Sequence, residues 1–185
     1  MRTARRPLVL ALPALLLLGL VVVLIVVGLS PKSSPGLTVR QLNAYQAAIT
    51  PPLRDGGATV QEGMKPAIND LVTQHTVPPQ AMVGEARDWV TSLQGNRKIV
   101  AAVHVPAALA DAQRLFLTSL DHYIEAAQDF GIAAGNASSR REWLQKVYAA
   151  GTAGDQAYDD ASGILQGWRH TLGLPSSPDF PGGGQ

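Results

Sequence analysis

The pattern of apolar positions divides the chain into one uninterrupted apolar run and a longer part with helical periodicity. Residues 8–29 contain no charged side chain and form the run. After it, apolar residues recur every three or four positions, which is typical of helices that bury one face, and no strand-like alternation competes. The pattern therefore predicts an all-α protein, in which a single N-terminal transmembrane helix precedes an antiparallel bundle of four to five helices.

The apolar run is long enough to anchor the protein in a membrane. At a rise of about 1.5 Å per residue, residues 8–29 can cross a hydrocarbon core about 30 Å thick. Arg2, Arg5 and Arg6 precede the run and only Lys32 follows it closely, so the positive-inside rule keeps the amino terminus in the cytoplasm. The alternative is a cleaved signal peptide, although its apolar region is typically shorter, at about 7–15 residues. Both interpretations place the bulk of the chain outside the cytoplasm.

The composition of the flanking segments predicts the domain organisation. A Lys-Ser-Ser-Pro-Gly stretch follows the run, and the chain ends in a segment rich in proline, glycine and serine. Gly173 suits the position just after a helix, and Pro175 prevents the helix from continuing. We therefore expect a cytoplasmic stub (residues 1–7), a transmembrane anchor (8–29), a flexible tether (30–37), an extracytoplasmic helical bundle (38–172) and a disordered tail (173–185).

Proline and glycine positions divide the bundle into five amphipathic segments. The first ends at Pro51-Pro52, and the second is interrupted near Pro66, so we expect a kink or break there, with the two segments as separate helices or as one kinked helix. The last segment begins with Ser139 and Glu142, which have the spacing of a capping box. The apolar positions of the five segments span residues 39–49, 60–71, 82–103, 109–130 and 144–172.

Charge and composition exclude several functional classes. Three of the fifteen basic residues precede the apolar run, which leaves twelve basic against fourteen acidic residues in the exported part, a formal charge of −2. This balance lacks the basic patch of a nucleic-acid-binding protein. The chain has no cysteine, so disulfides, thiolate metal sites and cysteine nucleophiles are excluded. No nucleotide-binding, nucleophile-elbow or zinc-protease motif is present, so we expect neither an enzyme nor a bound cofactor.

Four residues of the last segment form the candidate ligand pocket. Gly151 and Gly154 either leave room for a ligand or allow a large neighbour such as Trp89 or Phe116 to pack closely. Asp155 and Arg169 fall at the edge of the apolar seam, where partial burial calls for a partner. The two lie too far apart along a helix to pair with each other. Each therefore meets a charge on another helix, or both contribute to a polar pocket.

A stripe of carboxylates on the fourth segment has two interpretations. Asp121, Glu125 and Asp129 are four residues apart, and Asp111 falls on the same face. Such a stripe suits a hard cation such as calcium, but it is also typical of a solvent-facing helix, which the sequence favours. His122 follows Asp121, yet the chain lacks the Glu-x-x-His motif of di-iron bundles. We therefore predict no metal site.

These features predict a non-enzymatic, single-pass membrane protein of the cell envelope. We expect its helical domain to act as a protein-interaction or scaffold module, attached to the membrane through residues 8–29 and bound to a protein partner. The alternative is a ligand-binding or sensor domain with a pocket near Gly151, Gly154, Asp155 and Arg169. Nucleic acid is not an expected partner.

Overall fold

The computed structural model describes residues 36–74 and 77–180, and every regular element in this part of the chain is helical. The prediction of an all-α bundle is therefore confirmed. The predicted cytoplasmic stub, membrane anchor and most of the tether lie outside the described residues. No helix in the described ranges combines the length and the apolar character that crossing a membrane requires.

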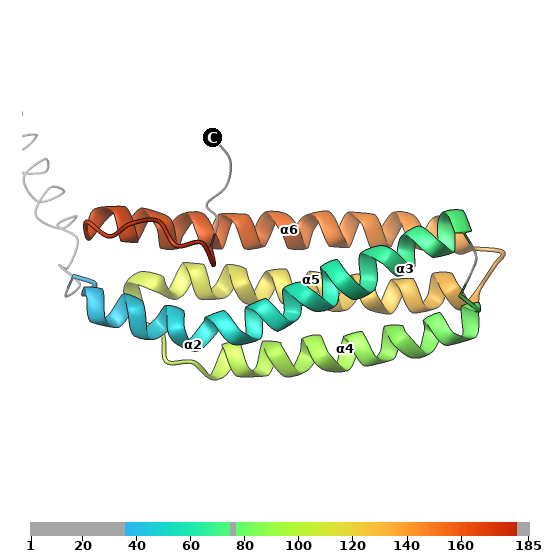
Figure 1. The fold of residues 1–185 in the computed structure, drawn as a ribbon, viewed down its shortest axis with the longest axis horizontal. Coiled ribbons are helices and arrows are strands. Elements are labelled where there is room, and N and C mark those ends of the chain that lie inside the picture. Colours follow the sequence, from blue (N-terminus) through green and yellow to red (C-terminus); the bar gives the residue numbers. More distant parts are fainter. Residues whose placement is uncertain (1–35, 75–76, 181–185) are drawn as a thin grey trace, which may run out of the picture. The chain divides into compact units, whose positions relative to one another are not determined.

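The described residues form four antiparallel helical rods (Figure 1). The first rod, called the N-terminal helical run below, is continuous over residues 39–74 and slants across the other three. The run comprises α2 (Val39–Ala58), the π-helical η1 (Thr59–Met64), α3 (Lys65–Asn69) and the π-helical η2 (Asp70–Gln74). The other rods are α4 (Pro79–Ala102), α5 (Ala110–Gly135), which the short 3₁₀ helix η3 (Ala107–Leu109) precedes, and α6 (Arg140–Thr171).

The N-terminal helical run passes straight through Pro51 and Pro52, so the predicted end of a helix at this point is wrong. A proline inside a helix removes the hydrogen bond to the carbonyl four residues earlier. Here those carbonyls belong to Ala47 and Ala48, which are exposed and can bond to water. Pro52 is itself buried, which offsets part of the lost bonding. The two predicted N-terminal segments are thus one helical rod, as in the alternative interpretation.

The expected interruption near Pro66 takes the form of a wider helical turn and not of a break. In η1, the Lys65 N–H donates to the carbonyl of Val60, five residues earlier, in place of the usual four. Pro66 follows in the first turn of α3, where its missing N–H is tolerated. Turns of this π type are rare and occur frequently at functional sites.

Side-chain capping occurs at a different helix from the predicted one. Thr38 caps α2: its hydroxyl accepts from the Gln41 N–H at 3.2 Å, and the Gln41 side chain accepts from the Thr38 N–H at 3.0 Å. At α6 the helix does begin after Ser139, but the Ser139 side chain makes no capping hydrogen bond. The predicted capping box at Ser139 and Glu142 is therefore wrong, because the backbone of Ser139 (φ −113°, ψ 9°) is not in the extended conformation that a cap requires.

Thr38→Ala and Ser139→Ala should consequently differ in their effect on stability. Thr38→Ala should lower the free energy of unfolding by about 1 kcal/mol, because it removes a working N-cap. Ser139→Ala should lower it by clearly less, because it removes a hydroxyl that has no hydrogen-bond partner in the described structure. Urea unfolding followed by circular dichroism measures both. An equal loss in the two variants would contradict this assignment of the caps.

Helix α5 lies at the centre of the core. It packs extensively against both α4 and α6, whereas α2 packs chiefly against α4. Its buried face includes Phe116, Leu120, Ala127 and Phe130, each at most 2% exposed. The Phe130 ring contacts Trp89 of α4 with ring centroids 5.4 Å apart. Helices α4 and α6 thus cover two sides of α5. The side that they leave uncovered lies between the N-terminal helical run and α6.

The end of α6 follows the prediction, but the segment after it does not. Gly173 adopts φ +69°, its N–H donates to His170, and the Leu174 N–H donates to Arg169, which together form a Schellman-type end. Beyond this, residues 174–180 fold back along the bundle and Phe180 is 1% exposed. The structure therefore differs from the expected disordered tail at residues 174–180, because the apolar side chain of Phe180 packs in the core. Residues 181–185 lie outside the described part.

Candidate functional site

A groove runs between the N-terminal helical run and α6, with α5 as its floor. It consists of two adjoining hollows that share Lys65, Tyr123 and Asp155 and that are both open to solvent. The first, called the polar hollow, has a volume of about 550 Å³. The second, called the apolar hollow, has a volume of about 310 Å³. Both lie within the size range of sites that bind small molecules or single protein segments.

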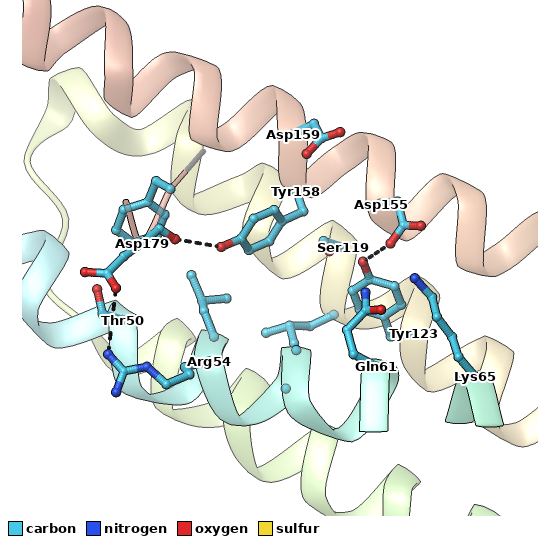
Figure 2. A pocket seen from close by; sticks show the side chains of 15 residues that line it. Thr50, Arg54, Gln61, Lys65, Ser119, Tyr123, Asp155, Tyr158, Asp159 and Asp179 are labelled. Atoms are coloured by element: carbon cyan, nitrogen blue, oxygen red, sulfur yellow. Dashed lines mark hydrogen bonds and ion pairs between the residues drawn. The ribbon is translucent and has the colours of Figure 1, made fainter. Parts of the chain in front are cut away.

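The polar hollow has charged groups on both of its walls (Figure 2). Arg54 and Lys65 come from the N-terminal helical run, while Asp155 and Asp159 come from α6. Asp179, from the segment after α6, pairs weakly with Arg54 at 3.8 Å, and both side chains are at least half exposed. The remaining polar lining residues are Thr50, Gln61, Ser119, Tyr123 and Tyr158.

The hydroxyl of Tyr123 links the floor of the groove to the α6 wall. It donates to Asp155 Oδ1 at 2.5 Å (Figure 2). Burial raises the pKa of Tyr123 far above its ordinary value, the adjacent Asp155 carboxylate raises it further, and the Ser119 hydroxyl beside the phenol offsets a small part. Tyr123 therefore remains a neutral hydrogen-bond donor, and Asp155 keeps its free oxygen for a second donor from solvent or a ligand.

Gly154 provides close packing and not a ligand slot. A Cβ at this position would lie 2.7 Å from Cε1 of Tyr123 and 2.9 Å from Cδ1, so no side chain fits without moving the ring. Of the two interpretations of this glycine, the structure agrees with the packing one, although the neighbour is Tyr123 and not Trp89 or Phe116. Trp89 lies instead against Gly63 of η1, where a Cβ would be 2.9 Å from the indole Nε1.

Gly151, three residues earlier, faces open space. No atom lies within 4 Å of a Cβ built there, and the residue lines the apolar hollow. Two large side chains on opposite edges of this hollow, Val72 and Tyr148, are 47% and 56% exposed. The other apolar lining residues are Val60, Met64, Ile68, Ala126 and Val147. The missing side chain at Gly151 therefore enlarges a solvent-accessible apolar surface.

Arg169 lies apart from the other three predicted site residues. Its guanidinium donates to Gln46 Oε1 at 2.8 Å and to the carbonyl of Pro175 at 2.6 Å. It lines neither the polar nor the apolar hollow but a third one of about 400 Å³, which adjoins the far end of the polar hollow and shares Arg54 and Asp179 with it. Among the described residues, neither Arg169 nor Asp155 takes part in an ion pair. Both instead use neutral hydrogen-bond partners, and the structure brings together Gly151, Gly154 and Asp155 but not Arg169.

The segment after α6 occupies one end of the groove. Phe180 packs against Phe116, with ring centroids 5.7 Å apart, and lines the polar hollow. The Gln166 side chain donates to the carbonyls of Ser177 and Phe180 and accepts from the Ser177 N–H. The Tyr158 hydroxyl donates to the Asp179 carbonyl at 3.1 Å (Figure 2). Side chains of α6 thus hold the backbone of residues 177–180 in place.

The carboxylate stripe of α5 lies outside this groove. Asp121 pairs with Arg97, Asp111 with Arg114 at 3.4 Å, and Glu125 with His122 at 3.5 Å. The pKa of Asp129 is raised, first by burial and then by the nearby Glu125 carboxylate. Within residues 36–74 and 77–180, no group of three or more histidine, aspartate or glutamate side chains is placed to hold a metal ion.

Two pairs of groove residues have a sequence spacing that places both members on one helix face. Asp159 follows Asp155 by four residues, which is one helical turn and places both on one face. Arg54 and Lys65 are eleven residues apart, close to three turns, but they share a face only if the helix continues through Pro51 and Pro52. Phe180 carried no such signal, because its surroundings are rich in proline and glycine.

Comparison of the chain with protein-family models, curated proteins and solved structures found no significant match.

Proposed function

We propose that the protein is a non-enzymatic binding module of the cell envelope, which residues 8–29 anchor in the membrane with the amino terminus in the cytoplasm. In this proposal the helical domain lies outside the cytoplasm and binds a segment of a partner protein in the groove between the N-terminal helical run and α6. The sequence supports the placement through its long uncharged apolar run and the three arginines before it.

The observation that carries the proposal is the form of the groove. Its polar and apolar hollows adjoin and both open to solvent, so together they make an elongated surface feature and not an enclosed chamber. Grooves between helices are a recurring site for protein segments, which place apolar side chains in the groove and polar ones at its rim. The exposed Val72 and Tyr148 at the edges of the apolar hollow provide surface for such contacts.

A substitution that fills the apolar hollow tests the proposal. Gly151→Leu places a side chain in this hollow. Gly163→Leu on the same helix is the matched control. A Cβ at Gly163, as at Gly151, meets no atom within 4 Å, and Gly163 lines neither the polar hollow, the apolar hollow nor the hollow at Arg169. The full-length protein and both variants are purified from membranes of the organism that encodes the chain, and co-purifying proteins are quantified by mass spectrometry. We expect a partner that is retained by the wild type and Gly163→Leu and is depleted at least about tenfold by Gly151→Leu.

Both variants should remain folded, because leucine is a better helix former than glycine at an open position. Circular dichroism of each variant checks this. A set of partners that is the same for all three proteins would contradict a role of the apolar hollow in binding.

One observation favours a second candidate function, the binding of a small ligand by a sensor domain. The polar hollow combines two phenol rings with the Asp155 carboxylate, whose second oxygen is free, and such convergent polar groups are typical of ligand sites. If this function holds, a small molecule from the envelope should raise the thermal unfolding temperature of the wild type, and Asp155→Ala should reduce that shift. Partner depletion by Gly151→Leu without any such ligand favours the first function.

A further inference from the structure

The segment after α6 shows how this groove receives a polypeptide. Residues 177–180 place one aromatic side chain, Phe180, in the core, while side chains of α6 hydrogen-bond the backbone before it and its own carbonyl. The acidic residue of this segment, Asp179, faces the basic Arg54 on the opposite wall. An apolar anchor, backbone recognition and one charge contact are the elements of peptide binding in a groove.

The rest of the groove offers the same kinds of contact, but its charged side chains on α6 are acidic, whereas the segment's Asp179 meets the basic Arg54. Beyond Asp179 toward the apolar hollow, the α6 wall carries Asp155 and Asp159, one helical turn apart and both exposed. Ser119 on the floor is 1% exposed, and its hydroxyl lies beside the Tyr123 phenol. Lys65 on the opposite wall forms no ion pair in this part of the chain.

The charges that line the groove leave a surplus of one carboxylate, since three aspartates face Arg54 and Lys65. Arg54 is already engaged by Asp179, so the surplus lies on the α6 wall. A ligand that is complementary to this acidic wall carries positive charge at the rim of the groove. It carries apolar groups beside that charge, because the apolar hollow has no charged lining residue other than the shared Lys65 and Asp155.

We infer that the occupant of the groove is a partner segment with a lysine or arginine beside apolar residues, the basic side chain at Asp155 and Asp159 and the apolar ones between Val72 and Tyr148. This inference rests on the proposed function and specifies its partner. The basic group reaches the free oxygen of Asp155 without disturbing the hydrogen bond from Tyr123. The apolar side chains use the space that the missing side chain of Gly151 leaves open.

Selection from a library of short random peptides tests the inference on the full-length protein in lipid nanodiscs. Peptides that bind the wild type but not Gly151→Leu are collected, because this step isolates ligands of the groove. We expect these peptides to be enriched in lysine or arginine next to large apolar residues. The best peptide is then synthesised together with a version in which glutamate replaces its basic residue.

Fluorescence anisotropy compares this peptide on the wild type, Asp155→Asn, Asp159→Asn and the control Asp160→Asn. Asp160 is an exposed residue of the same helix that lies outside the groove and accepts from Gln156. We expect each groove variant to weaken binding about two- to fivefold, as for an exposed charge pair, and the control to have no effect. The glutamate peptide should bind the wild type more weakly than the basic peptide does, and added salt should reduce this difference.

The outcomes separate this inference from the proposed function. Groove-dependent peptides without a basic residue, or an equal loss in Asp160→Asn, overturn the inference and leave the proposed function in place. A selection that yields no groove-dependent peptide overturns both. Binding of the amphiphile dodecylamine in the groove, with no peptide bound, also overturns both and supports the ligand-binding alternative.

Discussion

Gly154→Ala is expected to lower the free energy of unfolding by about 1–2 kcal/mol, whereas Gly151→Ala should raise it by about 0.5–1 kcal/mol. Both changes replace a glycine inside α6 by the best helix former, so both gain the same local stability. Only at Gly154 does the added methyl group meet another side chain, at 2.7 Å from the Tyr123 ring. Carbon atoms prefer separations of about 3.5–4.0 Å, so this contact is strongly repulsive.

The Tyr123 ring has little freedom to move away from Gly154. It is 9% exposed, and its hydroxyl is held by Asp155, the residue that follows Gly154. Urea unfolding of the two variants measures the difference. In the Tyr123→Ala background the penalty of Gly154→Ala should disappear, because the repulsive partner is gone. Equal stabilisation by both alanines in the wild-type background would contradict the packing role of Gly154.

Phe180→Ala is expected to destabilise the domain by about 2–3 kcal/mol and to release the segment after α6. Loss of a buried phenylalanine side chain from a core costs about 3–5 kcal/mol, and the lower value is expected here because a terminal segment can detach instead of leaving a cavity under strain. The ring is 1% exposed and contacts Phe116, so nearly all of its surface returns to water.

Limited proteolysis and urea unfolding together measure this effect. Residues 174–180 should be cleaved much faster in Phe180→Ala than in the wild type, because the hydrogen bonds from Gln166 and Tyr158 do not hold the segment alone. The control is Asp179→Asn, which removes only an exposed ion pair at 3.8 Å and should cost less than about 1 kcal/mol. Protection of the segment in Phe180→Ala at the wild-type level would show that its aromatic anchor is dispensable.

Local pattern was sufficient to predict the helical class, the start of α6 after Ser139 and the role of Gly173 at its end. These features depend on residues that are close in the sequence. The helix end predicted at Pro51-Pro52 was wrong because the cost of a proline depends on whether the freed carbonyls are exposed, which only the folded structure determines. The position of Phe180 depends on Phe116, which is far away in the chain.

The candidate site was predictable to a similar extent. The interruption of α6 by Gly151 and Gly154 pointed to a part of the bundle that borders the groove, but the sequence could not assign close packing to Gly154 and open space to Gly151. That difference depends on where the Tyr123 ring from another helix lies. Arg169 was grouped with Asp155 because both lie near the seam of one helix, yet they face different hollows.

Site-specific photo-crosslinking tests most directly whether the groove between the N-terminal helical run and α6 is the binding surface. A benzophenone amino acid replaces Tyr148 at the edge of the apolar hollow or, as the control, the exposed Ile99 on α4, which lines none of the hollows. The proposal predicts that the full-length protein in native membranes forms a covalent adduct with its partner from position 148 and not from position 99. An adduct from position 99 alone would contradict it.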